Sequence, residues 1–462
     1  MMADSQLRNL PSVDKVMRDH RLDEILRSTP RAIVVDWVRR SIDLLRNKIL
    51  AGDDRNEDLV CNEILQEVLS LSAADVGTRM RSVINATGII LHTNLGRAPL
   101  AQAAIERMVE AARYCNVEMN LETGQRNRRA TRVCELLSRL TGAEASLVVN
   151  NCAAATLLVL QAVASGREVI VSRGQLVEIG GGYRLPEVFA SSGAKLREVG
   201  TTNRTYIHDY EREIGEKTAA IIRVHRSNFS QQGFVHEPEL HELVTLGNSR
   251  GIPVIDDIGS GCLHDLSTLG LREPVVFESV RAGAALVLFS GDKLFGGPQS
   301  GLIVGQRTWI NVLEKNPMMR ALRADKLILA ALEATVECHL SGGAFAELPV
   351  LVSVARKPAE IQAQCENVCA RLQPDQRLSI TVVPCVSEVG GGAIPDARLE
   401  SFAIRIVGQS VDRLALHLRR GTPSVLTKIQ GGAILLDLRT VAVDQIDALV
   451  SCLNSRKCLH VW

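Results

Sequence analysis

The sequence predicts an α/β protein built on a mostly parallel sheet with helices on both faces. Six short apolar runs, separated by helical or loop-sized segments, support this prediction: residues 147–149, 169–171, 220–222, 253–255, 286–288 and 302–304. Continuous apolar strands that alternate with helices are typical of parallel sheets covered on both faces. Ligands of such sheets bind at the carboxyl ends of the strands, so the polar residues after each run are the candidates for chemistry.

Composition and charge narrow the class of protein. The 462 residues have room for two or three domains at about 150 residues each, and 46% of them are apolar. No apolar run approaches the roughly 20 residues of a membrane span, and the first residues lack the pattern of a secretory signal. The eleven cysteines include no CxxC pair, which argues against a zinc ribbon and fits reduced thiols. We therefore expect a cytoplasmic protein with no metal centre and no membrane partner, and a net charge of +1 predicts no general attraction to nucleic acid.

Residues 1–65 predict a small helical domain, followed by a linker at 66–85. Ser12, in the segment PSVD, is a candidate N-cap for a first helix. Between residues 31 and 50, one helical face carries apolar side chains: Val34, Trp37, Val38, Leu45 and Ile49. Residues 1–50 contain ten Lys/Arg and seven Asp/Glu. This small basic excess fits a solvated helical bundle and a phosphate-binding surface equally well.

A single lysine follows the fifth apolar run. The segment Ser290-Gly291-Asp292-Lys293 comes directly after this predicted strand and leads into a Gly-Gly-Pro turn. A lysine held at a partly desolvated strand end can act as a nucleophile or form a Schiff base with an aldehyde. The alternative is an ordinary loop lysine, and the groups at the other strand ends favour the chemical role.

Three other strand ends supply polar groups. Residues Asn151-Cys152-Ala153 open an alanine-rich helix, whose first N–H groups can face a phosphate. Asp256 and Asp257 form a carboxylate pair that either binds a cation, such as a pyridinium nitrogen, or caps the next turn. Asn228 follows the third run and can donate a hydrogen bond to a phenolic oxygen.

The order of these groups along the chain resembles that of the fold type I enzymes that depend on pyridoxal 5'-phosphate. The resemblance implies that Lys293 forms the Schiff base with the cofactor and that Asp257, in preference to Asp256, pairs with the ring nitrogen. It also implies that Asn228 reaches the phenolic oxygen of the cofactor. The remaining implied contacts are a phosphate seat and a turn near the cofactor at a dimer interface: Asn151, Cys152, Ala153 and Ser290 for the seat, Gly297 for the turn.

Longer segments narrow the resemblance to the bacterial selenocysteine synthases, the L-seryl-tRNA(Sec) selenium transferases. These segments are INATGIILHTNLGR at 84–97, SRGQLVEIGG at 172–181, SGDKLFGGPQ at 290–299 and LPSVD at 10–14. Two positions depart from the family pattern, because Cys152 replaces the third of three asparagines and Gln175 replaces a glutamate. A phosphate seat built from backbone groups tolerates a cysteine, so we expect these departures to change affinity more than activity.

The family resemblance implies a transferase that converts L-seryl-tRNA(Sec) to selenocysteinyl-tRNA(Sec). The implied route passes through an aminoacrylyl intermediate on pyridoxal phosphate, with selenophosphate as selenium donor. Lys293 takes the α-proton, and Asp292 assists proton transfer or the departure of the hydroxyl. Arg97, Arg320 and Arg323 match the positions implied for the anionic donor. The last two lie three apart on a predicted helix and share a face, which alone also fits a solvated surface.

The resemblance also implies a domain arrangement and an assembly. A large α/β domain at 86–340 binds pyridoxal phosphate, and a small α+β domain at 341–462 closes over it. Partly alternating runs at 378–383, 402–407 and 433–437 predict strands of the small domain. A glycine turn at 389–393 predicts a flexible connection. The implied assembly is a homo-oligomer, a ring of dimers with active sites between subunits.

Two other classes of function stay open. A lyase or β-replacement enzyme that uses pyridoxal phosphate on a free amino acid or amino sugar acid shares Lys293 and Asp257, but does not need residues 1–65. A non-catalytic tRNA-binding protein is the other class. It has no need of a Schiff-base lysine, so the combination of Asp257 and Lys293 with Asn228 and Ser290 argues against it.

Overall fold

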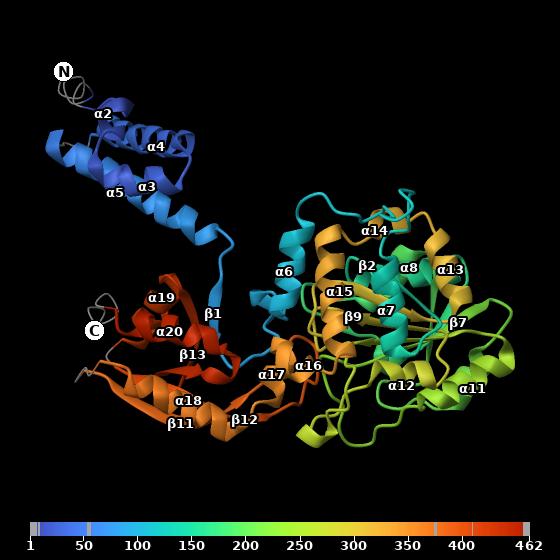
Figure 1. Ribbon diagram of the computed structural model, residues 1–462. Coiled ribbons are helices and arrows are strands. Elements are labelled where there is room, and N and C mark those ends of the chain that lie inside the picture. The colour runs from blue at the N-terminus through green and yellow to red at the C-terminus, as the bar shows by residue number, and fades with distance from the viewer. Residues whose placement is uncertain (1–6, 8–9, 53–56, 374–376, 409, 456–462) are drawn as a thin grey trace. The chain divides into compact units, whose positions relative to one another are not determined.

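The computed structural model describes the chain except residues 1–6, 8–9, 53–56, 374–376, 409 and 456–462 (Figure 1). The chain forms two compact units, Met1–Ser82 and Val83–Trp462. None of the described helices combines the length and hydropathy that a membrane span requires.

The first unit is a helical bundle made of α2 (Val13–Met17), α3 (Asp23–Ser28), α4 (Arg31–Leu50) and α5 (Glu57–Thr78). Ser12 caps α2, because its Oγ accepts a hydrogen bond from the Lys15 backbone N at 3.2 Å. The five apolar residues predicted to share one face of α4 are all buried, which confirms the predicted amphipathic helix. Four of them, Val34, Trp37, Val38 and Leu45, belong to one core with buried Ile64 and Val68 of α5.

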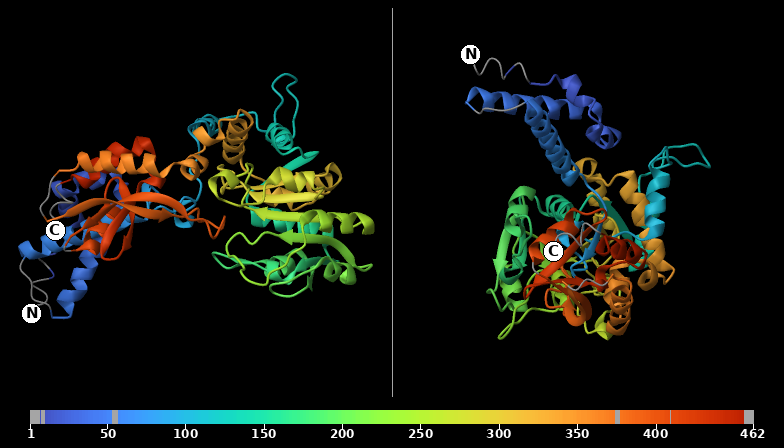
Figure 2. Two further views of the ribbon diagram at one scale, coloured as in Figure 1. Left: turned by 90° about the horizontal axis from the view of Figure 1, so that it is seen from below. Right: turned by 90° about the vertical axis from the view of Figure 1, so that its left-hand side faces the viewer.

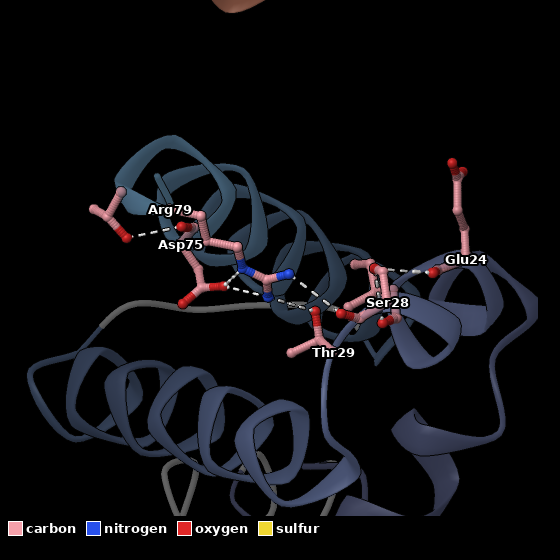
Figure 3. A network of polar contacts seen from close by, with 7 residues as sticks. Glu24, Ser28, Thr29, Asp75 and Arg79 are labelled. Atoms are coloured by element: carbon pink, nitrogen blue, oxygen red, sulfur yellow. Dashed lines mark hydrogen bonds and ion pairs between the residues drawn. The ribbon is translucent and has the colours of Figure 1, made fainter. Parts of the chain in front are cut away.

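An arginine at the end of α5 joins this helix to the end of α3 (Figure 3). The Arg79 guanidinium donates to Asp75 Oδ2 at 2.7 and 3.1 Å, and also to the Ser28 carbonyl and to Thr29 Oγ1 at 3.2 Å each. The Ser28 carbonyl lies at the C-terminal end of a helix, where carbonyls have no partner within the helix. Arg79 therefore supplies a donor that the end of α3 lacks.

The second unit contains a seven-stranded sheet with the order β2-β10-β9-β8-β7-β3-β6. Its strands are β2 (Ala145–Val149), β3 (Glu168–Ser172), β6 (Lys195–Val199), β7 (Thr218–Val224), β8 (Val254–Gly259), β9 (Leu286–Ser290) and β10 (Gly301–Gly305). All pairs are parallel except those of β10, which runs antiparallel to β2 and β9. The six predicted apolar runs each fall on one of these strands, so the mostly parallel sheet is confirmed.

Helices cover both faces of this sheet, as predicted. Alternate residues of β2 and β9 belong to two different cores: Leu147 and Leu288 to one, Val148 and Val287 to the other. The first face packs against α8 (Cys152–Ala164), α9 (Leu185–Ser192) and α13 (Arg307–Lys315). The second face packs against α7 (Thr131–Thr141), α10 (Ile207–Glu213), α11 (Leu240–Arg250), α12 (Val276–Arg281) and α15 (Lys326–Leu340). Smaller elements complete this part: α6 (Gln102–Ala111), α14 (Met319–Leu322), β4 (Glu178–Ile179) and β5 (Tyr183–Arg184).

A second sheet, of five strands, has the order β1-β13-β14-β12-β11. Its strands are β1 (Val83–Ala86), β11 (Ser379–Ser387), β12 (Leu399–Val407), β13 (Ser424–Gln430) and β14 (Ala433–Asp437). Helices α18 (Pro358–Ala370), α19 (Val411–Arg420) and α20 (Ile446–Leu453) share its core, and α16 (Ala344–Glu347) and α17 (Pro349–Ala355) precede them. Apart from β1, which is blue, the strands of this sheet and helices α18, α19 and α20 are drawn in orange and red in Figure 2. The three strands predicted after residue 341 are β11, β12 and β14, so these are confirmed.

Two features of the chain differ from the linker expected at 66–85. Helix α5 continues to Thr78 without a break, because its first glycine is Gly77. Strand β1 begins at Val83 and pairs in parallel with β13 of the C-terminal sheet, where Figure 1 shows it in blue beside red strands. The four-part division at residues 65, 85 and 340 stays a prediction.

Candidate active site

A cavity of about 290 Å³ lies at the carboxyl ends of β8 and β9, at the N-terminus of α8. Eight of the residues singled out from the sequence line it: Arg97, Asn151, Cys152, Ala153, Asp257, Ser290, Asp292 and Lys293. Seven of them lie at or just after the ends of β2, β8 and β9, which are near one another in the sheet order β2-β10-β9-β8, and Arg97 lies in the segment before α6. The rule that ligands bind at the carboxyl ends of parallel strands accounts for this gathering.

Lys293 lies in the turn after β9 and is 5% exposed. Its Nζ donates to the Gly392 carbonyl at 3.4 Å, a contact that joins the turn to the glycine segment of the C-terminal part. Gly392 has φ +73°, and a Cβ there would lie 3.8 Å from the Lys293 Nζ and from the Ser227 Oγ. Of the glycine turn predicted as a flexible connection, Gly392 therefore lies beside the lysine, while Gly390 and Gly391 pack against Leu91.

Asp257 faces the cavity from the end of β8. Its Oδ2 accepts a hydrogen bond from Thr156 Oγ1 at 3.0 Å, and the Cys152 thiol lies 3.9 Å from its Oδ1. Burial raises the pKa of the Asp257 carboxyl to about 6. A carboxylate at this depth is costly unless a cation or hydrogen-bond donor reaches it, and a protonated ring nitrogen is such a partner.

Asp256 cannot take that place. Both of its carboxylate oxygens accept hydrogen bonds from Arg223 of β7, at 2.7 and 2.8 Å, and it is fully buried. Successive strand residues point to opposite faces of a sheet, which places Asp256 on the face away from α8. The geometry therefore favours Asp257 over Asp256 as the partner of a ring nitrogen.

The N-terminus of α8 offers a seat for an anion. The Asn151 side chain accepts from the Ala154 N at 2.8 Å and caps the helix, and small side chains follow it. The first N–H groups of a helix have no intrahelical partner and carry a partial positive charge. Gly301 of β10 packs so closely that a Cβ there would lie 2.1 Å from the Asn151 carbonyl oxygen. Ser290 and the Cys152 thiol flank this seat, and burial raises the pKa of the Cys152 thiol, which stays neutral.

An ion pair closes another side of the cavity. The Arg97 Nη1 lies 2.8 Å from Asp292 Oδ2, and the Asp292 side chain is 8% exposed. Arg97 has φ +62°, a left-handed conformation that is uncommon for a residue with a Cβ. The backbone thus directs this guanidinium towards the turn that carries Lys293.

Four residues expected at the site do not line this cavity. Asn228 is exposed, and its Nδ2 donates to the Glu178 carbonyl at 2.6 Å instead of facing the cavity. Gly297 is buried, where a Cβ would lie 3.2 Å from Phe295 and Thr335. Arg320 and Arg323 line a second cavity, of about 620 Å³.

The prediction that Arg320 and Arg323 share a helical face was wrong. Helix α14 ends at Leu322, and Arg323 is extended, with φ −62° and ψ 137°. The Arg323 Nη1 lies 3.8 Å from Glu118 Oε1. The extended backbone forms a bridge with Val149 at the end of β2, and this strand contact overrides the helical pattern.

Further cavity residues were not singled out from the sequence. Thr156 lies one helical turn after Cys152, so helical spacing could have indicated it. Tyr183 reaches the cavity from β5, and burial raises the pKa of its hydroxyl. His225 and Ser227 follow β7 and belong to the same polar segment as Asn228. In the described part of the chain, no group of three His, Cys, Asp or Glu side chains is placed to hold a metal ion.

These features define the class of the protein. The sheet order, the buried lysine after β9 and the aspartate of β8 are those of a fold type I pyridoxal-phosphate enzyme. A family model described as L-seryl-tRNA selenium transferase matches residues 83–442, and one described as selenocysteine synthase N terminal matches residues 7–46. The chain belongs to the L-seryl-tRNA selenium transferase family.

Known relatives match over nearly the whole chain. The L-seryl-tRNA(Sec) selenium transferase of Geobacter sulfurreducens is 44% identical over 96% of this chain and 98% of its own. The enzyme of the same name from Desulfomicrobium baculatum is 45% identical over 97% of this chain and 98% of its own. Among solved structures, D-glucosaminate-6-phosphate ammonia-lyase matches with a TM-score of 0.58 at 22% identity. That match covers 84% of this chain and 98% of the lyase, and it shows the shared fold.

Proposed function

We propose that this protein uses pyridoxal 5'-phosphate to convert L-seryl-tRNA(Sec) to selenocysteinyl-tRNA(Sec). One observation carries the proposal: a buried lysine and a buried aspartate line one cavity in a chain whose named relatives match 96% and 97% of its length. We further propose that selenophosphate is the selenium donor, that the enzyme acts in the cytoplasm, and that it forms a ring of dimers.

The residues of the cavity fit the proposed cofactor. The N-terminus of α8 and Ser290 would hold its phosphate, and Lys293 would hold its aldehyde carbon. Asp257 would keep its ring nitrogen protonated, because this carboxylate has no other cationic partner within hydrogen-bond distance among the described residues. When bound, the cofactor withdraws electrons from the α-carbon of the amino acid.

The chain supplies the proton transfers of the proposed reaction. Lys293 would take the proton from the α-carbon of the seryl group, and the β-hydroxyl would leave as water. Asp292 lies next to Lys293 and is held by Arg97, so it would orient a proton donor towards the hydroxyl. The selenium atom of the donor would then add to the β-carbon, water would cleave its bond to phosphorus with release of phosphate, and a proton would return to the α-carbon.

Arginines would recognise the anionic donor. Arg97 is the cavity residue suited to this task, and its pairing with Asp292 means that the donor must share or replace that ion pair. Arg320 and Arg323 line the second cavity, so in the proposed ring they would serve an active site through a neighbouring subunit.

We also propose a division of labour among the domains. Residues 1–65 would contact the tRNA through phosphates and shape, residues 66–85 would link the domains, residues 86–340 would bind the cofactor and residues 341–462 would cover it. Helix α4 is amphipathic, so its basic side chains lie on the exposed side, where a phosphate partner could reach them. Two of these, Arg40 and Arg46, pair with Asp36 and Asp43 of the same helix.

Absorption spectroscopy tests the proposal. Protein purified with pyridoxal phosphate should show the visible band of a lysine-bound cofactor, and Lys293→Ala should lose it. Lys315→Ala, which changes an exposed lysine of α13, is the matched control and should keep the band. Seryl-tRNA(Sec) should change the band, while free serine and D-glucosaminate 6-phosphate should not. A band that responds to either free compound and ignores the tRNA would favour the lyase alternative.

A further inference from the structure

A buried carboxylate lies behind a histidine of the cofactor cavity. His225 follows β7 and lines the cavity, and its backbone N donates to the Asp257 carbonyl at 2.8 Å. Its Nε2 lies 3.4 Å from Glu273 Oε2, and the Glu273 side chain is 1% exposed. Glu273 Oε1 and His225 Nε2 are both buried and have no hydrogen-bond partner among the described residues, so the 3.4 Å approach is a close contact between groups that can carry opposite charges and not a hydrogen bond.

This burial constrains the charge of the pair. A carboxylate removed from water is unfavourable unless it is paired, and the structure places the imidazole of His225 beside it, a group that becomes a cation when it takes up a proton. An imidazole whose Nε2 proton faces a carboxylate leaves its Nδ1 free for another contact, as in other histidine–carboxylate pairs of enzymes. In the charged form of this pair, the positive end is nearer to the cavity than the negative end, because Glu273 lies behind His225.

Other titratable groups lie near the His225–Glu273 pair. Cys262 interacts electrostatically with Glu273, and burial raises the pKa of its thiol to about 12, so it stays neutral. The titratable groups that share the cavity with His225 come from several elements: Asp257 of β8, Asp292 and Lys293 after β9, Cys152 of α8, Tyr183 of β5 and Arg97. The Asp292 carboxylate is already paired with Arg97.

We propose that His225 carries a proton at the cofactor site and that Glu273 is the residue that positions it. This inference rests on the proposed function and its cofactor site. The negative charge of Glu273 beside Nε2 would favour the imidazolium form of His225, so Nδ1 can donate a proton to a group bound in the cavity and receive one back. The pair returns to its starting state after each turnover, with no net gain or loss of protons.

The test is the pH titration of the cofactor's visible band in the loaded protein. The positive end of the pair faces the cavity, so it lowers the pH midpoint of this band. Glu273→Gln, which keeps the size of the side chain, should raise the midpoint by about half a pH unit or more. His225→Asn should raise it by a similar amount, and the double variant should add nothing to the larger single effect.

Two comparisons separate this role from a merely structural one. Glu278→Gln, at an exposed position of α12, should leave the midpoint unchanged. Glu273→Gln should lower kcat and leave KM for seryl-tRNA(Sec) unchanged, because Glu273 lies behind His225 and does not line the cavity. If Glu273→Gln does not fold, His225→Asn alone decides the question.

The possible outcomes distinguish this inference from the proposed function. A wild-type protein without any visible band contradicts the proposed cofactor site and removes the basis of the inference. A normal band with the same midpoint in wild type, Glu273→Gln and His225→Asn overturns the inference and leaves the proposed function standing. Additive shifts in the double variant overturn it as well, because they show two independent effects.

Discussion

Asp256 and Asp257 are consecutive residues of strand β8, yet their carboxylates face opposite sides of the sheet and have different partners. Asp256 is held by two hydrogen bonds from Arg223, and Asp257 faces the cavity. The two aspartates therefore have separable roles, one structural and one in the site.

Asn substitutions should separate these roles. Asp257→Asn should keep the fold and lower kcat about 100-fold, because an amide cannot keep the ring nitrogen of the cofactor protonated. Asp256→Asn should reduce the free energy of unfolding by about 3 kcal/mol, because it leaves the largely buried Arg223 without its counter-charge. Steady-state kinetics and thermal unfolding measure the two effects. Equal losses of activity at equal stability would contradict the assignment.

The raised pKa of Asp257 predicts a pH dependence in the cofactor-free protein. Its folded-state pKa of about 6 exceeds the ordinary value of 3.8, so the folded state binds the proton more tightly and loses stability as pH rises from about 4 to 6. The loss reaches about 3 kcal/mol above pH 6. Asp257→Asn lacks this penalty, so its Tm should exceed that of wild type by a few degrees at pH 7 and by almost nothing at pH 4. A constant difference between pH 4 and pH 7 would show that the titration of Asp257 is not the cause.

The buried side chain of His339 predicts the opposite dependence of stability on pH, with stability lost as the pH falls. His339 of α15 donates from Nε2 to the Phe295 carbonyl at 2.9 Å, and its Nδ1 lies 3.1 Å from His264 Nε2. Burial lowers the pKa of His339 from 6.5 to about 4, so stability is present above pH 6.5 and is lost as pH falls towards 4. The loss at pH 5 should be about 2 kcal/mol. His339→Gln should show a smaller change in Tm between pH 7 and pH 5 than wild type does.

Ala substitutions at two glycines with similar backbone angles test the importance of the segment beside Lys293. Gly391 has φ +63°, and a Cβ there would lie 2.6 Å from Leu91 Cβ; Gly432 has φ +68° and open space around it. Both Ala substitutions introduce backbone strain of about 1 kcal/mol. Gly391→Ala should cost at least about 1 kcal/mol more and also weaken cofactor binding, because it displaces the segment that contacts Lys293. Equal effects of the two substitutions on cofactor binding would argue against this contact.

Proteins that lack the first unit should differ sharply according to whether they begin before or after strand β1. A protein that starts at residue 83 should keep the cofactor band and lose the binding of seryl-tRNA(Sec), because residues 1–82 form a separate compact unit. A protein that starts at residue 87 is the matched control. It lacks β1, so the hydrogen bonds of that strand to β13 are missing and thermal stability should fall. Retained tRNA binding in the first protein would contradict the proposed role of the N-terminal helices.

Local sequence pattern predicted the buried strands well and the exposed or distant ones poorly. The six apolar runs are strands because each is buried on both faces. Strand β6 is an edge strand with the sequence KLREV and three exposed side chains, so no apolar run marks it. Strands β1 and β13 pair across more than 300 residues, and no local pattern states that partnership.

In the candidate site, too, local sequence indicated some residues, and contacts with distant parts of the chain decided the others. Position at a strand end was enough to indicate Asp257, Ser290 and Lys293, because the sheet brings strand ends together. The direction of a loop side chain is set by tertiary contacts, and for that reason Asn228 faces the Glu178 carbonyl instead of the cavity. Gly392 reaches Lys293 from a different part of the chain, which only the folded structure brings near.

The pairing of β1 with β13 also has a consequence for synthesis on the ribosome. Residues 83–86 leave the ribosome long before residues 424–427, their partners in the sheet. During that interval the backbone donors and acceptors of β1 have no sheet partner, and the C-terminal sheet cannot close. The lysine turn and its cavity can form earlier, since their strands end at residue 305, but the Gly392 contact arrives later. The nascent protein thus completes the surroundings of Lys293 only after the segment that contains Gly392 has been made.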